Sequence, residues 1–147
     1  MIAVDTNILI YAHNPADPLH CDALTALRWL SGGGRRWAVP LPCLVEFYRL
    51  STHPRVLGQT ADAALSAIDA LIAAPGCAVV ALGAGDWPAF AAIAREARAR
   101  GNLAFDTHIA AACRTNGVRA ILTEDRDFRR FDGLRAMTLA DNWRAST

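Results

Sequence analysis

Residues 1–7 read Met-Ile-Ala-Val-Asp-Thr-Asn, and this stretch decides the fold class. Residues 2–4 form a short apolar run that predicts a buried strand, and the run stops at Asp5. Residues 6–12 then predict a short helix. A buried strand that ends at an acid and leads directly into a helix is typical of a βα unit.

The same alternation continues along the chain. Residues 37–39, 78–82 and 120–122 predict further buried strands, and residues 136–139 predict a fifth. Between them, helices are predicted from Asp17-Pro18 to Gly32, over 42–50 and 60–73, from Asp86 to Gly101, and from Asp106 to Asn116. This pattern predicts an α/β fold with three α/β/α layers and a mostly parallel sheet of four to five strands, in a single domain over residues 1–147.

Composition excludes several kinds of chemistry. The 147 residues are 53% hydrophobic and 20% charged, which indicates a globular chain, and the net charge of +1 points to no partner. All 15 basic residues are arginine. Without a lysine, a Schiff-base enzyme and a Walker-type phosphate loop are excluded.

Cysteine spacing and the hydrophobic runs place the chain in a reducing, aqueous compartment. Cys21, Cys43, Cys77 and Cys113 are far apart and form no metal or disulfide pattern, so we predict reduced thiols in the core. The first residues lack the basic region of a signal peptide. The longest uncharged run, residues 70–85, is too short and too broken to span a bilayer. We therefore expect a soluble cytoplasmic protein.

Acidic residues follow the predicted strands. Asp5 and Asp125 come after the first and fourth strands, so both belong at the carboxyl edge of the sheet, where ligands bind in such folds. Asp106 reaches that edge if two helices make the crossover that leads into the fourth strand. Glu46 falls on a helix face that the pattern predicts to be largely buried, where an ionised carboxylate is costly unless it is paired or binds a metal.

Each acid also has a simpler structural interpretation. Asp5 and Asp106 suit helix N-caps, Asp125 suits a turn, and Glu46 suits an ion pair with Arg49 at i,i+3. Together, however, carboxylates that converge on one edge repel one another without a cation. Oxygen-rich clusters of this kind suit Mg²⁺ or Mn²⁺.

Four segments of the sequence resemble one family. They are the start through Asp5-Thr-Asn, Leu-Val-Glu46-Phe-Tyr, Phe-Asp106-Thr-His-Ile-Ala-Ala, and Thr-Glu-Asp125-Arg-Asp127-Phe. In this order and spacing they resemble a PIN domain and, more narrowly, the VapC toxins of bacterial type II toxin–antitoxin systems.

The resemblance implies a Mg²⁺- or Mn²⁺-dependent endoribonuclease. Its catalytic acids map to Asp5, Glu46, Asp106 and Asp125, with Asp5, Asp106 and Asp125 as the metal ligands and Glu46 as a ligand or an orienting group for the attacking water. Thr6, Asn7 and Asp127 are candidates for polar groups behind these acids. The resemblance also implies an RNA substrate, homodimers, and a hetero-oligomer with a VapB-like antitoxin.

Other polar and aromatic residues are weaker candidates. Arg126, Arg129 and Arg130 flank Asp125 and are candidates for contacts with RNA phosphates, although a solvated face explains them equally well. We predict that His108 points away from Asp106 along its helix. The tryptophans fit core or interface positions, although one exposed ring would stack on a base.

Two rival functions are weighed against the ribonuclease. A phosphatase of the haloacid dehalogenase type also begins with an acid after the first strand, but it requires Asp-x-Asp, and Asn7 stands at the second position. The second rival is a PIN-like module that binds RNA or protein and has lost catalysis. The intact set of acids argues against that module.

Overall fold

The computed structural model describes residues 1–141 and 143–146, and in this part of the chain all five predicted strands form. The elements in chain order are β1 (Ile2–Val4), α1 (Thr6–His13), α2 (His20–Ser31), β2 (Trp37–Pro40), α3 (Leu41–Thr52), α4 (Ala61–Ile72), β3 (Cys77–Val80), η1 (Ala84–Asp86), α5 (Trp87–Glu96), α6 (Leu103–Thr115), β4 (Ala120–Leu122), η2 (Arg126–Arg130), β5 (Arg135–Met137) and η3 (Trp143–Ser146).

The strands form one parallel sheet in the order β3-β2-β1-β4-β5. The central strand β1 pairs with both β2 and β4, so that Ala3 lies opposite Ala38 on one side and Ile121 on the other. The prediction of a mostly parallel α/β sheet is confirmed.

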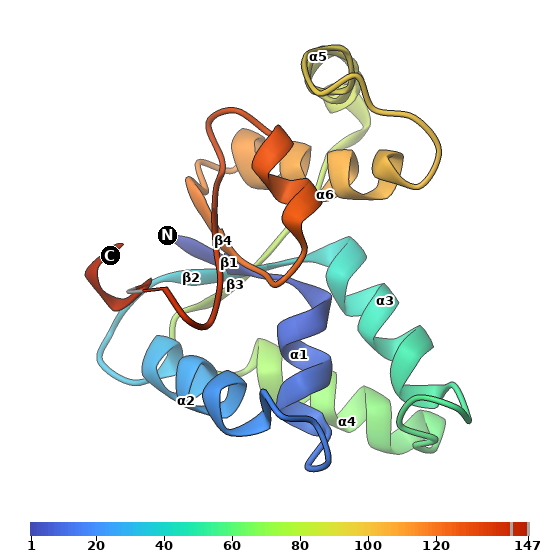
Figure 1. The fold of residues 1–147 in the computed structure, drawn as a ribbon, viewed down its shortest axis with the longest axis vertical. Coiled ribbons are helices and arrows are strands. Elements are labelled where there is room, and N and C mark those ends of the chain that lie inside the picture. The colour runs from blue at the N-terminus through green and yellow to red at the C-terminus, as the bar shows by residue number, and fades with distance from the viewer. Residues whose placement is uncertain (142, 147) are drawn as a thin grey trace.

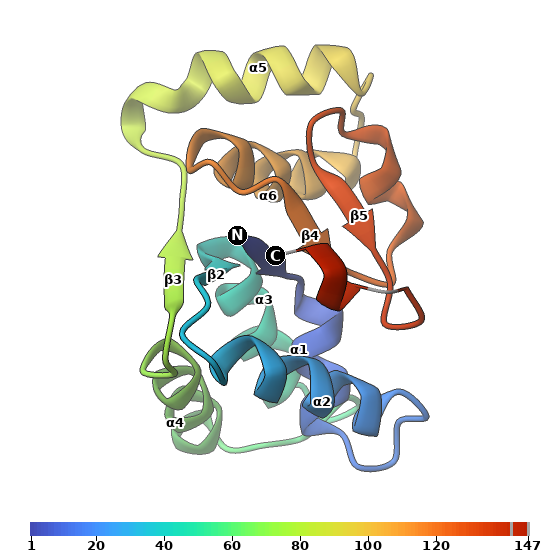
Figure 2. The same ribbon diagram turned by 90° about the vertical axis from the view of Figure 1, so that its left-hand side faces the viewer.

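Helices cover both faces of the sheet. Helices α1 to α4 lie on one side of the strands, and α5 and α6 lie on the other, as both ribbon views show (Figures 1 and 2). Right-handed crossovers require this arrangement. The chain moves outward from β1 to β2 and β3, then returns across the sheet to β4 and β5, so the later helices must cover the opposite face.

The reversal of strand order creates a crevice between β1 and β4. The chain leaves β1 toward α1 on one face and leaves β4 toward η2 on the other. Ligands in open α/β sheets bind outside the carboxyl ends of the strands at such a point. The fold therefore selects the end of the sheet where Asp5 and Asp125 lie.

Several predicted helix boundaries are wrong by a few residues. Helix α2 begins at His20, because Asp17 instead holds a turn by accepting a hydrogen bond from the Leu19 N–H at 2.8 Å. Helix α5 ends at Glu96 rather than near Gly101, since Arg98 turns the chain with a left-handed φ of 50°. Helix α6 begins at Leu103, which places Asp106 in its first turn.

The predicted inner face of α5 is partly wrong. Ile93 and Ala97 are buried as expected, but Trp87 is 69% exposed. Helix α5 packs on α6 at the edge of the molecule, and the first turn of α5 projects past α6 (Figure 2).

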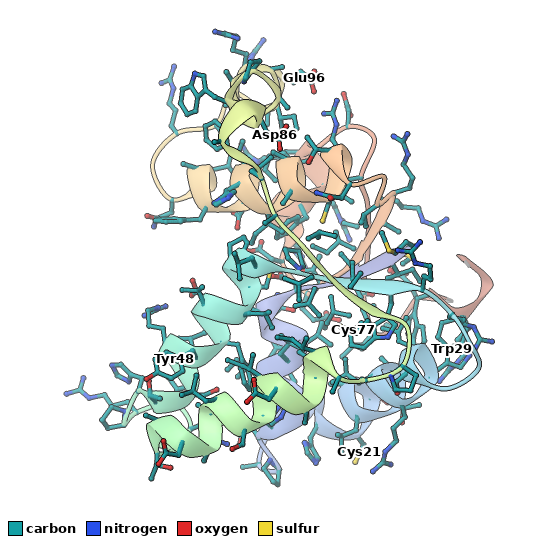
Figure 3. The ribbon with its side chains drawn as sticks, turned by 180° about the vertical axis from the view of Figure 1, so that it is seen from behind. Cys21, Trp29, Tyr48, Cys77, Asp86 and Glu96 are labelled. Atoms are coloured by element: carbon teal, nitrogen blue, oxygen red, sulfur yellow. The ribbon has the colours of Figure 1, made fainter. Side chains whose placement is uncertain are left out.

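The cysteines are free thiols, as predicted, but they do not all lie in the core. Cys43 and Cys113 are buried and Cys77 is half-buried, whereas Cys21 is exposed on α2 (Figure 3). In the described ranges, 1–141 and 143–146, no helix has the length and apolar character needed to cross a membrane.

Candidate active site

The Asp5 carboxylate lies at the carboxyl end of β1, where it caps α1. Its Oδ1 accepts a hydrogen bond from the Thr6 N–H at 2.7 Å. Its Oδ2 accepts bonds from Asn7 Nδ2 at 2.8 Å and from the Thr123 hydroxyl at 2.6 Å. The residue is only 5% exposed, so these donors hold the carboxylate in one orientation.

The Thr123 hydroxyl joins the ends of β1 and β4. Besides donating to Asp5, it accepts hydrogen bonds from Asn7 Nδ2 at 3.1 Å and from the Asp125 N–H at 3.0 Å. A hydroxyl offers one donor and two acceptor positions, and all of them are used here. Because the Glu124 N–H also donates to Asn7 Oδ1 at 3.3 Å, the loop that carries Asp125 is fixed to the β1–α1 turn.

A cavity of about 1030 Å³ opens at this edge, and we call it the acid cavity. Asp5, Glu46, Asp106 and Asp125 all line it. Asp106 reaches it from the first turn of α6, and Glu46 from the first half of α3. Figure 1 shows that α1, α3 and α6 all begin beyond the same end of the strands, although α6 covers the opposite face of the sheet. Two helices, α5 and α6, do make the crossover into β4, and Asp106 lines the cavity at the carboxyl edge under the condition that the sequence set for it.

The four carboxyl groups influence one another electrostatically. Burial, followed by the charges of Asp125, Asp5, Asp127 and Glu46, raises the pKa of Asp106 to about 7. Burial also raises the pKa of Asp5 above its usual value, although hydrogen bonds from Thr123, Thr6 and Cys43 oppose this shift. Burial and the neighbouring carboxylates therefore both favour the protonated forms of Asp5 and Asp106.

The donor chemistry of the cavity fits a hard divalent cation, but the acids do not form a closed ligand set. Carboxylate oxygens are the ligands that Mg²⁺ and Mn²⁺ prefer, and a cation would relieve the repulsion that, after burial, raises the pKa of Asp106. Over residues 1–141 and 143–146, however, no three His, Cys, Asp or Glu side chains lie close enough together to hold a metal.

Glu46 lies in a different environment from the one predicted. Its side chain is 44% exposed and forms a 2.7 Å ion pair with Arg49, the simpler of the two interpretations. The apolar pattern of α3 correctly identifies a helix, but the Glu46 side faces the open cavity rather than the core. Arg49 also lines the cavity and places a positive charge beside the acids.

The remaining predicted residues differ in whether their side chains contact Asp5. Asn7 contacts Asp5 directly, whereas the Thr6 hydroxyl donates to the Cys43 carbonyl at 3.4 Å and only the Thr6 backbone reaches Asp5. Asp127 forms an ion pair with Arg130 at 3.2 Å, and its N–H donates to Asp125 Oδ1. His108, which is predicted to point away from Asp106 along the helix, lines the acid cavity as Asp106 does.

The predicted RNA-contact arginines stand apart from the cavity wall. Arg126, Arg129 and Arg130 belong to η2, and all three are exposed. The lining of the acid cavity includes Arg49 and none of these three.

Sequence reasoning missed two residues that touch Asp5. Thr123 occupies the first position after β4, as Asp5 does after β1, and this equivalence is a signal that could have identified it. The Cys43 thiol approaches Asp5 Oδ1 at 3.7 Å from α3. Burial and the charge of Asp5 hold the pKa of this thiol well above its usual value, so it stays protonated and acts as a weak donor. No spacing rule would have found it.

The order of the strands, the crevice at β1 and β4, and the acids around it define a class of protein. The PIN-domain family matches residues 2–134, so the chain belongs to that family.

Curated relatives narrow this assignment to the VapC ribonucleases. Ribonuclease VapC48 of Mycobacterium tuberculosis is 34% identical over 134 residues, which cover 89% of this chain and 92% of the relative. Ribonuclease VapC43 of the same species is 35% identical over 137 residues, with 92% of each chain covered.

Solved structures agree on the fold. The structure of VapBC2 from Rickettsia felis bound to a promoter DNA fragment matches with a TM-score of 0.69 at 19% identity, covering 94% of this chain and 98% of that one. M. tuberculosis VapC20, described as a sarcin-ricin loop cleaving toxin, matches with a TM-score of 0.65 at 22% identity, covering 92% and 99%.

Proposed function

We propose that this protein is a divalent-metal-dependent endoribonuclease that acts as the toxin of a type II toxin–antitoxin pair. The observation that carries the proposal is the acid cavity itself. It is lined by Asp5, Glu46, Asp106 and Asp125, and it lies where the strand order reverses between β1 and β4. Membership of the VapC ribonucleases supports the same reaction and an RNA substrate. An enzyme that acts on cellular RNA would work in the cytoplasm.

Asp5, Asp106 and Asp125 would hold the metal partly through water molecules, because among the described residues no three such side chains lie close enough together to bind it directly. When bound, Mg²⁺ or Mn²⁺ supplies a Lewis acid that activates water and offsets charge on the phosphate. Asp5 is suited to a fixed ligand because donors hold both of its oxygens. Asp106 and Asp125 come from α6 and from the loop after β4, so they approach from the other side of the crevice.

Two further side chains would act on the substrate. Glu46 would orient the attacking water and accept its proton, and Arg49 would place positive charge near a phosphate oxygen. Their 2.7 Å ion pair keeps both groups at the rim of the cavity. Because water rather than the neighbouring ribose hydroxyl attacks phosphorus, the products should carry no 2′,3′-cyclic phosphate.

A metal titration of RNA cleavage tests this function. Purified bacterial ribosomal and transfer RNA are incubated with the protein in EDTA, Mg²⁺ or Mn²⁺, and the ends of the fragments are mapped. We expect cleavage only with a metal, and a loss of at least about 10²-fold in Asp5→Asn, the scale seen when one charge-stabilising group is removed.

A matched control is Asp69→Asn, which removes an exposed carboxylate from α4 and should cleave normally. Metal-independent cleavage, or full activity of Asp5→Asn, would refute the proposal. RNA binding without turnover in either metal would instead favour the catalytically silent module.

An antitoxin is the second part of the proposal. The acid cavity has apolar walls that include Leu41, Val45 and Leu50, and such a groove suits an amphipathic helix. We propose that a VapB-like partner lays a helix there with a basic side chain near the acids, and that the complex contains homodimers of this chain. Neighbours of this fold include the VapBC complex of Salmonella typhimurium, at a TM-score of 0.64 and 17% identity.

A further inference from the structure

A second, smaller cavity of about 390 Å³ adjoins the acid cavity, and we call it the aromatic pocket. Trp87 and Phe90 of α5 form one wall, and Phe105 and His108 of α6 form another. Leu82, Phe105 and His108 line both cavities, so the two cavities adjoin. Its volume lies in the range of pockets that bind small ligands, roughly 300–1,000 Å³.

Two large aromatic rings at the mouth of this pocket are exposed to solvent. Trp87 is 69% exposed and Phe105 is 70% exposed. Both rings line the same pocket, and contiguous exposed apolar surface commonly marks a binding site. Neither ring contributes much to the core, so their position needs another explanation.

The pocket is also rigidly built. The indole of Trp87 stacks on the ring of Phe90 with centroids 5.2 Å apart and an angle of 21° between the planes. The turn before Trp87 is fixed because Asp86 Oδ2 accepts a hydrogen bond from the Gly83 N–H at 2.7 Å. Figure 3 shows Asp86 where the chain, rising from Cys77 in β3, turns into α5. The indole is therefore held in place before any ligand arrives.

We propose that the aromatic pocket binds an unpaired nucleobase of the RNA whose phosphate lies in the acid cavity; this rests on the proposed function. Proteins recognise single-stranded RNA by stacking bases on exposed aromatic rings. Trp87 provides the stacking face, and His108 lies where the two cavities meet and can bond to the base or to its ribose.

Charge favours a nucleic acid over another protein as the occupant. Among the residues that the structure describes, no Asp or Glu lines the aromatic pocket. Arg95, Arg98 and Arg100 are exposed along α5 and its connection to α6, and this connection ends at Asn102 in the wall of the acid cavity. Glu96 pairs with Arg114 at 2.8 Å and so does not neutralise them locally.

These arginines complement the phosphates of a strand that enters the acid cavity. They would repel a second copy of the same face. Measurements of oligomeric state and antitoxin affinity distinguish a second copy and an antitoxin segment from RNA as the occupant.

The test measures binding of two RNA probes by fluorescence anisotropy, with Ca²⁺ in place of Mg²⁺ to limit cleavage. One probe is a single-stranded RNA of CA repeats about twelve nucleotides long, and the other is an abasic ribose-phosphate strand of the same length. We expect the wild-type protein to bind the probe with bases about 5- to 150-fold more tightly, the effect of stacking one base.

Variants of Trp87 separate stacking from simple apolar contact. Trp87→Ala and Trp87→Leu should lose the preference for the probe with bases, whereas Trp87→Phe should keep most of it because a phenyl ring still stacks. Leu65→Ala is the matched control, since Leu65 is a large apolar residue 49% exposed on α4, on the opposite side of the sheet.

The outcomes distinguish the possible occupants. Equal preference in wild type and Trp87→Ala would overturn the nucleobase pocket while leaving the acid site intact. Recovery by Trp87→Leu, or a change in oligomeric state or antitoxin affinity without a change in base preference, would assign the pocket to a protein partner. Metal-independent cleavage, or an active Asp5→Asn variant, would instead refute the proposed function itself.

Discussion

Replacing Thr123 by valine should reveal how strongly one hydroxyl supports the ionised Asp5. Thr123 is 1% exposed and its hydroxyl donates to Asp5 Oδ2 at 2.6 Å. Valine keeps the shape of the side chain and removes that donor, together with the acceptor for Asn7 and for the Asp125 N–H.

The magnitude follows from these contacts. A hydrogen bond to a charged group contributes about 1.5–3 kcal/mol, and the groups left without their acceptor add to this cost. Asn7 retains its bond to Asp5 and the Asp125 N–H is only partly buried, so their share is small. We expect a total loss of about 2–4 kcal/mol in the free energy of unfolding, or roughly 5–15 °C in Tm for a chain of this size.

The loss should depend on pH in a defined direction. The Thr123 hydroxyl lowers the pKa of Asp5 and so stabilises the ionised form, whereas burial holds that pKa above the usual 3.8. The deficit of the valine variant is therefore fully present above the folded-state pKa of Asp5. It shrinks as the pH falls through that pKa and Asp5 takes up a proton.

Urea unfolding in EDTA, at several pH values, measures this effect. The control is Thr25→Val, which removes an exposed hydroxyl that bonds only within α2 and should change stability by less than about 0.5 kcal/mol. In an Asp5→Asn background, Thr123→Val should cost about 1–2 kcal/mol less, because the charge is gone. Equal losses for Thr123→Val and Thr25→Val at neutral pH, or equal cost in both backgrounds, would refute this reasoning.

Two further predictions concern metal binding and the sheet. Because the pKa of Asp106 is about 7, protons compete with the cation for this carboxylate. The affinity for Mn²⁺, measured by calorimetry, should therefore rise as the pH increases toward about 7 and then level off. Asp106→Asn should remove that rise, and a flat profile for the wild type would contradict the prediction. Gly76→Ala should destabilise the chain by more than about 1–3 kcal/mol in thermal unfolding, because φ is +76° there and a Cβ would lie 1.8 Å from the Arg35 carbonyl oxygen. Gly117→Ala is the control, since Gly117 has a similar φ of +73° with open space around it, and this substitution should cost less. Equal costs for the two variants would contradict the steric argument.

Much of the fold could be read from local patterns. Three of the strands come from short apolar runs that are followed by helices, at residues 2–4, 37–39 and 120–122. A short apolar run before a helix is enough to predict a buried parallel strand. Boundaries were less certain because they depend on turns. The start of α6 at Leu103 and the end of α5 at Glu96 depend on the left-handed turn at Arg98, which no periodicity encodes.

The helical pattern also cannot distinguish a face that meets the core from one that meets an opening. Trp87 and Glu46 both occur at positions that periodicity assigns to an inner face. In the folded chain, Trp87 is 69% exposed and Glu46 borders the acid cavity. Their exposure depends on how far the neighbouring helices extend, which is a property of tertiary packing.

The sequence by itself determined the α/β class, the parallel sheet and the acids at its carboxyl edge, because each depends on residues close together in the chain. Only the tertiary structure decided how those acids are supported. Thr123 lies 118 residues from Asp5 and Cys43 lies 38 away, yet both donate to the same carboxylate. The order of the strands reverses at β1, which places the end of β4 beside the end of β1. Contacts between segments so distant in sequence leave no local sequence pattern.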